Sequence, residues 1–291
     1  MDSRSLKAFI AVTETGSFSA AAENLHLTQP AISKRIALLE EQLGVLLFDR
    51  AGRQIAPTQA GQVLLPWARE ILQAVTDAQR AIDDLQGEVR GKLSIATSHH
   101  IGLHRLPPWL KDFSRRYPDV KLDLHFLDSE QAYQEILQGR FDLAVITLAE
   151  EHDPRISSQP LWMDRLQFVA APGHPLTARK HISIEDLSGF PAIMPDANTY
   201  TTRLVRKVFD QQQQTLDVTM VTNHLDTIKM MVSIGLGWGV LPETMLDKNL
   251  SSLDVDTPTL TRPLGCIYHR QRSLNNAASR FLESLKQTPA S

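Results

Sequence analysis

Residues 16–50 read GSFSAAAENLHLTQPAISKRIALLEEQLGVLLFDR, and this stretch decides the fold of the N-terminal part of the chain. Its pattern predicts two short helices joined by a tight turn at residues 26–27. We expect Ser19 to cap the first helix, in which three consecutive alanines permit close packing. Thr28 is the expected cap of the second helix, and Pro30 lies in its first turn, where a missing N–H costs nothing.

The second helix has two different faces. On a wheel of 100° per residue the apolar side is formed by Ile32, Ile36, Leu39 and Leu43. The opposite side is small and polar, and it is formed by Pro30, Ser33, Lys34 and Ala37. Such a face fits a DNA major groove about 12 Å wide. An ordinary helical hairpin with a solvated face is the alternative interpretation.

The residues that follow favour the DNA-binding interpretation. Strands are predicted over residues 45–48 and 54–56, and the turn between them makes a two-stranded wing. Arg50 and Arg53 lie near the tip of this wing, where they suit backbone phosphates. A further helix precedes the pair, so residues 1–58 are predicted to form a winged helix-turn-helix.

The sequence at this point resembles the LysR-type transcriptional regulators. The resemblance is carried by residues 16–50 and by the PTQAG run at residues 57–61. It implies that the start of the second helix contacts operator DNA, with support from neighbouring cations. The expected DNA-binding residues are Ser19, Thr28, Gln29, Pro30, Ser33, Lys34, Arg35, Arg50 and Arg53.

The charge balance excludes a protein that coats nucleic acid without selectivity. The chain has 30 Lys and Arg against 33 Asp and Glu, a formal net charge of −3. Because few cations are available to release counterions from DNA, a single copy should bind weakly.

Residues 59–90 are predicted to form a long linker helix followed by a hinge. An apolar seam at heptad spacing runs along this helix and consists of Leu64, Ala68, Ile71, Val75, Ala78, Ile82 and Leu85. The seam either packs on its own domain or pairs with a second copy. We expect pairing, in a homodimer or a homotetramer, because two copies place two reading helices on one operator.

Residues 91–291 have a different, β-α-β pattern. Strands are predicted at residues 92–97, 120–127, 141–147, 166–171, 192–194, 218–222, 239–241 and 265–269. Helices are predicted at residues 103–117, 130–138, 202–211, 226–234 and 275–286, the first of them interrupted early by Pro107 and Pro108. This α/β alternation implies parallel strands in two lobes, lobe I at 91–162 and 266–291 and lobe II at 163–265. The family resemblance implies an effector domain similar to periplasmic binding proteins.

Ligands of open α/β sheets lie beyond the carboxyl ends of strands and near helix N-termini. The side chains expected there are Ser98, His99, His100, Thr147, Thr199, Thr201 and Thr202. Their neutral donors suit an anion or a carboxylate, and His100 can add charge near its ordinary pKa of about 6.5. Each could instead be a helix cap, but the set favours an effector pocket.

A further resemblance concerns the effector. Residues 96–100, ATSHH, and residues 226–229, DTIK, resemble the branch of the family that regulates cysteine biosynthesis. This implies a sulfur-containing anion, such as a sulfate-like effector, or a small carboxylate such as an acetylated serine. Ile101 departs from that branch, which has a polar residue at this position.

Two motifs imitate other chemistry. His99, His100 and His104 include a pair at the i, i+4 spacing of metal ligands, but no carboxylate accompanies them in an HExxH arrangement and no cysteine lies nearby. Gly235, Gly237 and Gly239 imitate a dinucleotide fingerprint, yet they follow a helix and precede a strand, the reverse of the required order. We therefore expect neither a metal nor a cofactor.

We predict a transcription factor controlled by a small effector. An enzyme is disfavoured because no GxSxG or comparable catalytic arrangement occurs, and a transport binding protein has no use for a DNA-reading unit. The single cysteine, Cys266, fits a packed apolar residue better than a redox sensor. With neither a signal-peptide pattern nor a membrane-spanning stretch, we expect a cytoplasmic protein. Its expected partners are double-stranded DNA, a second copy and the effector, and RNA polymerase is a further candidate.

Overall fold

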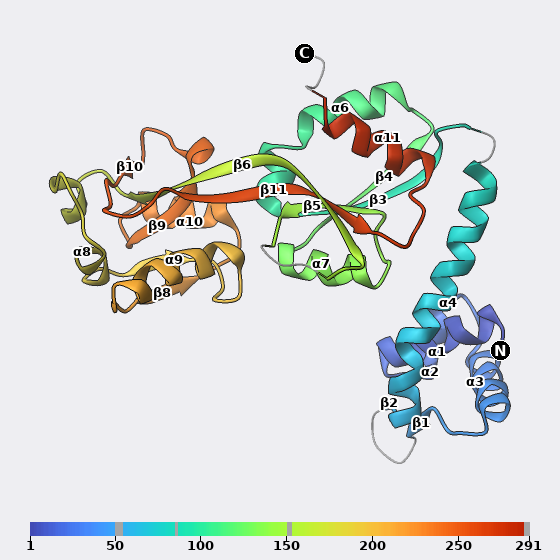
Figure 1. Cartoon of the computed structure of the whole chain (residues 1–291). Coiled ribbons are helices and arrows are strands. Elements are labelled where there is room, and N and C mark those ends of the chain that lie inside the picture. Colours follow the sequence, from blue (N-terminus) through green and yellow to red (C-terminus); the bar gives the residue numbers. More distant parts are fainter. Residues whose placement is uncertain (50–54, 85–86, 150–152, 288–291) are drawn as a thin grey trace. The chain divides into compact units, whose positions relative to one another are not determined.

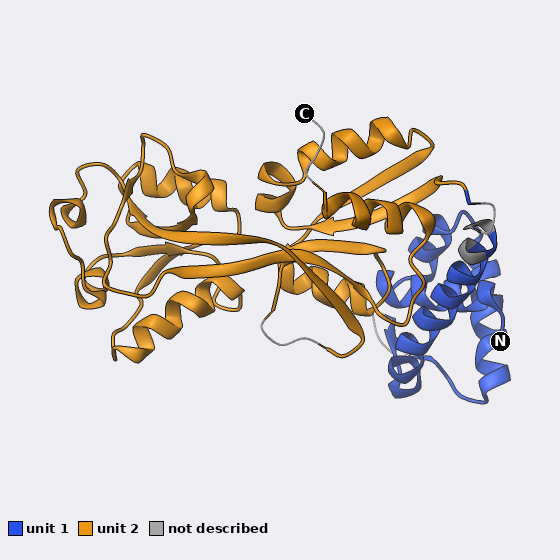
Figure 2. Cartoon of the chain, turned by 45° about the horizontal axis from the view of Figure 1, so that its top comes forward, with its two compact units in different colours: residues 1–87 blue, residues 88–291 orange. Residues whose placement is uncertain are grey.

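The computed structural model describes residues 1–49, 55–84, 87–149 and 153–287. Within these ranges the chain forms two compact units, residues 1–87 and residues 88–291, each with its own hydrophobic core (Figure 2). Among the described residues, no helix combines the length and the apolar character that crossing a bilayer requires.

The first unit is a helix-turn-helix with a short antiparallel wing (Figure 1). Its elements are α1 (Ser3–Thr15), α2 (Phe18–Asn24), α3 (Gln29–Leu43), β1 (Phe48–Asp49), β2 (Ala56–Pro57) and α4 (Gln59–Asp84). The core forms around Phe9, whose ring centroid lies 5.4 Å from that of Phe48. Gly16 ends α1 with a φ of 62°, a left-handed conformation that glycine adopts without strain.

The start of α2 differs from the prediction. Ser17, not Ser19, is its N-cap, because the Ser17 side chain accepts the N–H of Ala20 and Ser19 is exposed within the helix. The helix starts earlier because Phe18 packs edge-on against Phe48, 5.9 Å away, and so belongs to the core. Thr28 is the N-cap residue of α3, although its side chain makes no capping hydrogen bond.

Two further predictions for this unit overestimated the apolar side of α3 and the length of the wing strands. Leu43 is 40% exposed, since it is the last residue of α3 and lies beyond the core that buries Ile32 and Ile36. Among the described residues of the wing, Phe48 and Asp49 pair with the returning strand, and residues 45–46 are exposed and lie outside this pairing. Arg50 and Arg53 lie outside the described residues.

The seam of α4 is only partly covered. Ala68 is fully buried, and Leu64 and Ile71 pack against the core of the first unit. Further along the same helix, Val75 is 55% exposed and Ile82 is 62% exposed. An apolar stripe therefore continues past the region that this unit itself covers.

The second unit is built on one mixed sheet with the strand order β4-β3-β5-β11-β6-β9-β7-β8, and β10 adds to β6. The strands are β3 (Gly91–Thr97), β4 (Val120–Phe126), β5 (Leu143–Thr147), β6 (Ile156–Ala170), β7 (Ala192–Met194), β8 (Val218–Val221), β9 (Trp238–Pro242), β10 (Ser251–Ser252) and β11 (Leu260–His269). The α-helices are α5 (His99–His104), α6 (Pro107–Arg116), α7 (Ser129–Leu137), α8 (Ile184–Ser188), α9 (Tyr200–Gln211), α10 (Leu225–Ser233) and α11 (Asn276–Leu285).

Two lobes share this sheet. In lobe I, β3 runs parallel to β4 and β5, and in lobe II, β7 runs parallel to β8 and β9. The long antiparallel strands β6 and β11 run from one lobe to the other (Figure 1). The predicted lobe boundaries, after residues 162 and 265, fall inside these two strands.

The structure changes the bounds of two predicted elements of this unit. The interruption expected at Pro107 and Pro108 is confirmed, because these prolines begin a new helix, α6, but the preceding helix α5 starts at His99 and not at residue 103. The strand expected at residues 166–171 is only the end of β6, which begins at Ile156.

The two crossing strands approach closely at Gly265. Their register shifts between Leu264 and Gly265, and a Cβ at position 265 would lie 2.3 Å from the carbonyl oxygen of Gln159. The next residue, Cys266, is fully buried in the lobe I core, and burial raises the pKa of its thiol to about 12. This agrees with a packing role, since the reactive thiolate form is suppressed.

Candidate functional site

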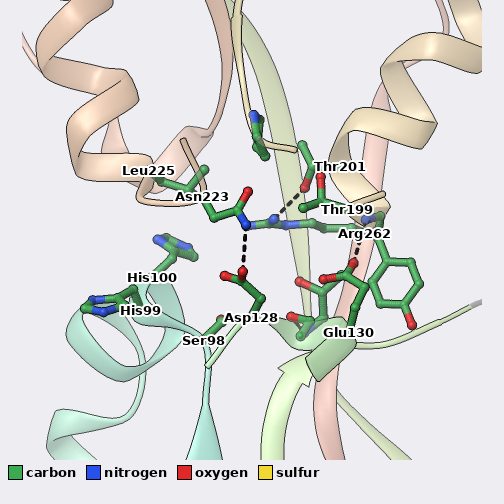
Figure 3. A pocket seen from close by; sticks show the side chains of 14 residues that line it. Ser98, His99, His100, Asp128, Glu130, Thr199, Thr201, Asn223, Leu225 and Arg262 are labelled. Carbon is green, nitrogen blue, oxygen red and sulfur yellow. Dashed lines mark hydrogen bonds between the residues drawn. The ribbon is translucent and has the colours of Figure 1, made fainter. Parts of the chain in front are cut away.

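The candidate effector site is a cleft between the two lobes. Its cavity has a volume of about 60 Å³. The lining residues are Ser98, His99, His100, Asp128, Ser129, Glu130, Thr147, Pro195, Thr199, Tyr200, Thr201, Asn223, Leu225 and Arg262 (Figure 3). All the predicted effector residues except Thr202 are among them, so strand ends and helix N-termini from distant parts of the sequence meet here.

The structure separates capping residues from free hydroxyls. Ser98 is the N-cap residue of α5 but makes no capping hydrogen bond with its side chain. Thr199, in contrast, caps α9 by accepting the N–H of Thr202. The Thr202 hydroxyl is 2.9 Å from the carbonyl oxygen of Pro195, to which it donates, and Thr202 lies outside the cavity lining. The capping alternative therefore holds for Thr199, and Ser98 is left with a hydroxyl that faces the cavity.

A buried ionic cluster supports one wall of the cleft. Asp164 on β6 is 1% exposed, and Arg262 on β11 donates to it over 3.1 Å. Arg105, which follows α5, donates to the other carboxylate oxygen over 2.8 Å. The second terminal nitrogen of Arg262 donates to the Thr201 hydroxyl over 2.7 Å. The cluster thus connects both crossing strands to the N-terminal turn of α9.

Opposing influences set the charges in this cluster. Burial acts most strongly on Asp164 and favours its neutral form, but the nearby His100 ring, the charge of Arg262 and the hydrogen bond from Arg105 together lower its pKa. Burial also lowers the pKa of His100, whose Nε2 lies 3.4 Å from the Asp164 carboxylate. The expectation that His100 contributes charge near pH 6.5 is therefore wrong, because burial disfavours its protonated form.

Direct hydrogen bonds join the two lobes across the cleft. The Asn223 side chain in lobe II donates to Asp128 in lobe I over 2.6 Å (Figure 3). The backbone N–H of Tyr200, at the start of α9, donates to Glu130 over 2.8 Å. At the edge of the cleft, His104 lies 3.3 Å from Asp226. In the first two bonds lobe I supplies a carboxylate and lobe II supplies the donor.

Sequence reasoning missed the charged residues of the cleft. Asp128 and Glu130 follow the strand predicted at residues 120–127, so the rule that found Ser98 also applied to them. No comparable signal marked Arg262, because it lies inside a strand. The two residues to which its side chain donates are far away in the sequence: Asp164 is 98 residues away and Thr201 is 61 residues away.

The motifs that imitate other chemistry have structural roles. The His99 ring packs against Phe126 at 4.9 Å and against His224 at 4.4 Å. Within the described ranges, no group of three or more His, Cys, Asp or Glu side chains has a geometry that could hold a metal. Gly235 has a φ of 85° and follows α10, where it forms a turn.

The candidate DNA-reading surface is the start of α3. Thr28, Gln29, Pro30 and Lys34 are exposed, while Ser33 and Arg35 are half-buried. The Gln29 side-chain amide donates to the Ser33 hydroxyl over 3.0 Å, so the two polar groups are held side by side. Behind this surface the buried Glu40 carboxylate accepts the backbone N–H of Leu47 over 2.8 Å and joins α3 to the wing.

Both units match known protein families. Residues 3–62 match the family described as bacterial regulatory helix-turn-helix protein, lysR family, and residues 86–290 match the LysR substrate binding domain. An uncharacterized HTH-type transcriptional regulator in the ibpB-leuC intergenic region of Azotobacter vinelandii is 65% identical over 108 residues, 37% of this chain and 75% of the relative. The uncharacterized HTH-type transcriptional regulator YeiE of Escherichia coli K12 is 32% identical over 285 residues, 96% of this chain and 95% of the relative. The solved structure of full-length CbnR complexed with its target DNA has the same fold, with a TM-score of 0.67 and 23% identity over 98% of this chain and 99% of that chain.

Arg262→Met is expected to lower the free energy of unfolding by about 3 kcal/mol, because it leaves the buried Asp164 charge undercompensated. Adding Asp164→Asn should restore part of this loss, since the buried charge is then absent. Urea unfolding followed by circular dichroism measures both effects. Arg280→Met is the matched control, because Arg280 pairs with Glu283 at the surface and such pairs contribute at most about 1 kcal/mol. Equal losses in Arg262→Met and Arg280→Met would contradict the role of the cluster.

Proposed function

Because the chain belongs to the LysR family of transcriptional regulators, and is not an enzyme, we propose that its regulation of transcription is controlled by a small molecule bound in the cleft. The observation that carries this proposal is the convergence of Ser98, Thr147 and Thr201 with a helix N-terminus in one interlobe cavity. The protein acts where its operator DNA lies, in the cytoplasm, and RNA polymerase is a further candidate partner.

Control follows from the way in which the lobes are joined. The sheet continues through β6 and β11, whereas the cleft is bridged by individual side-chain and backbone hydrogen bonds. An effector that binds one lobe spacing better than another shifts the population toward that spacing. The difference between the effector's binding free energies for the two lobe spacings is the free energy available to change the geometry of the DNA-reading units.

For DNA recognition we propose that Gln29 and Ser33 contact base edges, supported by Thr28 and Pro30. Lys34 and Arg35 provide phosphate contacts that fix the register without reading sequence. A Gln side chain offers both a donor and an acceptor, which suits bidentate contact with adenine in the major groove. Arg50 and Arg53 of the wing remain predicted phosphate contacts.

Gln29→Ala is expected to cost about 1–3 kcal/mol of discrimination between the preferred site and other DNA, because a base contact is lost. The binding site is first obtained by selection from a random duplex pool, and affinities are then measured by fluorescence anisotropy at fixed salt. Lys7→Ala, an exposed change on α1, is the control and should bind like the unmodified chain. A loss of affinity that is equal for all sequences would assign Gln29 to the DNA backbone instead.

For assembly we propose that the exposed half of the α4 seam pairs with a second copy, in a homodimer or a homotetramer. Val75 and Ile82 continue the heptad pattern past the part of α4 that packs on its own unit. An apolar stripe at this spacing is covered when two such helices pack together.

Val75→Glu is expected to shift the protein toward monomers, because it places a charge in the seam. Sedimentation velocity at micromolar concentrations measures the shift. Thr76→Glu adds the same charge at the neighbouring exposed position, outside the seam, and should leave the assembly intact. If Val75→Glu sediments like the unmodified chain, α4 does not provide the interface.

For the effector we propose a molecule that carries an anionic group, as a sulfur-containing anion or a small carboxylate does. The cavity supplies hydroxyl donors from Ser98 and Thr201 and the N-terminal turn of α9. Neutral donors and a helix N-terminus are a usual combination for binding such a group.

In a thermal-shift screen of the full chain with sulfate, sulfite, acetylated serine and small carboxylates, we expect stabilisation by an effector. At 100 times Kd the gain is about 2.7 kcal/mol. Ser98→Ala should reduce this shift, whereas Ser252→Ala, an exposed change on β10, should not. A shift that is unchanged by both Ser98→Ala and Thr201→Ala would place the ligand elsewhere.

A further inference from the structure

The cleft has a charge pattern that narrows the class of its ligand. We propose that the effector is a zwitterion, specifically an α-amino acid, whose ammonium group binds Asp128 and Glu130 and whose carboxylate binds lobe II donors. This inference rests on the proposed function of the cleft as the effector site. It adds the requirement for a positive group, which a sulfate-like anion or a simple carboxylate lacks.

Lobe I presents acceptors to the cleft. Asp128 is the N-cap residue of α7, yet its side chain makes no capping hydrogen bond and instead accepts from Asn223 across the cleft. Glu130, two residues further, accepts from the Tyr200 backbone. Between them, the Ser129 hydroxyl accepts the N–H of Thr147 and fixes the start of α7 to the end of β5. The fold therefore holds two carboxylates at the cleft that do not cap their own helix.

Lobe II presents donors at the same place. They are the Tyr200 N–H at the start of the 12-residue helix α9, the Asn223 amide and the Thr201 hydroxyl. Independently, the side chain of His100 lines the cavity at 4% exposure, and its Nδ1 has no hydrogen-bond partner among the described residues. A buried polar atom without a protein partner at the cavity wall is available to hydrogen-bond a bound molecule.

The two faces together favour a zwitterion over a ligand with charge of one sign. Among the described lining residues, Asp128 and Glu130 are negative and Arg262 is positive, but the charge of Arg262 is already matched by Asp164. A purely anionic ligand would face two uncompensated carboxylates, and a purely cationic one would leave the N-terminus of α9 without an acceptor. A zwitterion replaces both interlobe bonds, because its ammonium donates to lobe I and its carboxylate accepts from lobe II.

The small volume of the cavity agrees with a ligand that replaces the two interlobe hydrogen bonds. About 60 Å³ has room for a few waters, whereas ligand sites usually enclose about 300–1,000 Å³. The Asn223–Asp128 and Tyr200–Glu130 bonds close the space that an amino acid needs. Its entry must break these bonds and widen the lobe spacing, so occupancy and lobe spacing are coupled.

The test uses the full chain in a thermal-shift screen of the twenty L-amino acids, followed by calorimetric titration of any that bind. For each binder, the α-hydroxy acid lacks the ammonium group and the amino-acid amide lacks the carboxylate. We expect binding of at least one amino acid and a loss of about tenfold or more in affinity for both analogues. Asp128→Asn and Glu130→Gln should each weaken the binder by a similar factor, and Glu283→Gln, at the exposed α11 surface, should not.

The outcomes separate this inference from the proposed function. If sulfate, sulfite or a simple carboxylate binds with sensitivity to Ser98→Ala, and no amino acid binds, the cleft is an effector site but the zwitterion assignment is wrong. The assignment is also wrong if Asp128→Asn and Glu130→Gln tighten the binding of such anions without affecting amino acids. If neither class binds while sequence-specific DNA binding is intact, the effector role of the cleft fails as well. A cooperative thermal transition like that of the unmodified chain shows that the effector unit of each variant is folded, because DNA binding depends on the other unit.

Discussion

The buried carboxylate of Asp164 is the interaction on which the cleft depends. It lies on β6, one of the two strands that cross between the lobes, and it accepts from Arg262 on the other crossing strand and from Arg105 in lobe I. A charge at 1% exposure is tolerated only when paired and hydrogen-bonded, so these three side chains hold one another in place. Arg262 also donates to the Thr201 hydroxyl and so connects the crossing strands to the N-terminal turn of α9.

This arrangement divides the effector unit into a stiff part and an adjustable part. The crossing strands pair along their length, and the buried Asp164 carboxylate between them is held by two arginines, so they define an axis that both lobes share. The two bonds inside the cleft, Asn223 to Asp128 and Tyr200 to Glu130, each join a lobe I carboxylate to a lobe II donor. A ligand can replace such bonds one for one, whereas it cannot replace the sheet. The site is therefore suited to converting occupancy into lobe spacing.

In the DNA-reading unit, too, a buried carboxylate joins separate parts of the fold. The buried Glu40 of α3 accepts the backbone N–H of Leu47 and so connects the reading helix to the wing. The exposed Gln29 and Ser33 are held against each other on the surface of that helix. With a formal net charge of −3 for the whole chain, affinity has to come from local contacts and from a second copy, not from a general attraction to DNA.

The sequence by itself determined what depends on local patterns. Helical periodicity, the three consecutive alanines and the proline at the start of α3 predicted the helix-turn-helix, and β-α-β alternation predicted two lobes. A strand end identified Ser98 and a helix N-terminus identified Thr201 as cleft residues. Local patterns also misplaced the cap of α2, because only tertiary packing shows that Phe18 belongs to the core.

Only the tertiary structure decided the ionic content of the cleft. Asp164 and Arg262 are 98 residues apart, and each lies inside a strand where no local signal marks a charged residue as buried. Their partners are set by the register of β6 against β11, a non-local pairing that sequence periodicity does not encode. The same holds for His100, whose burial beside Asp164 disfavours the charge that its sequence context had indicated. The physical reason is that local propensity selects helices and strands, whereas desolvation and charge pairing depend on which of them meet.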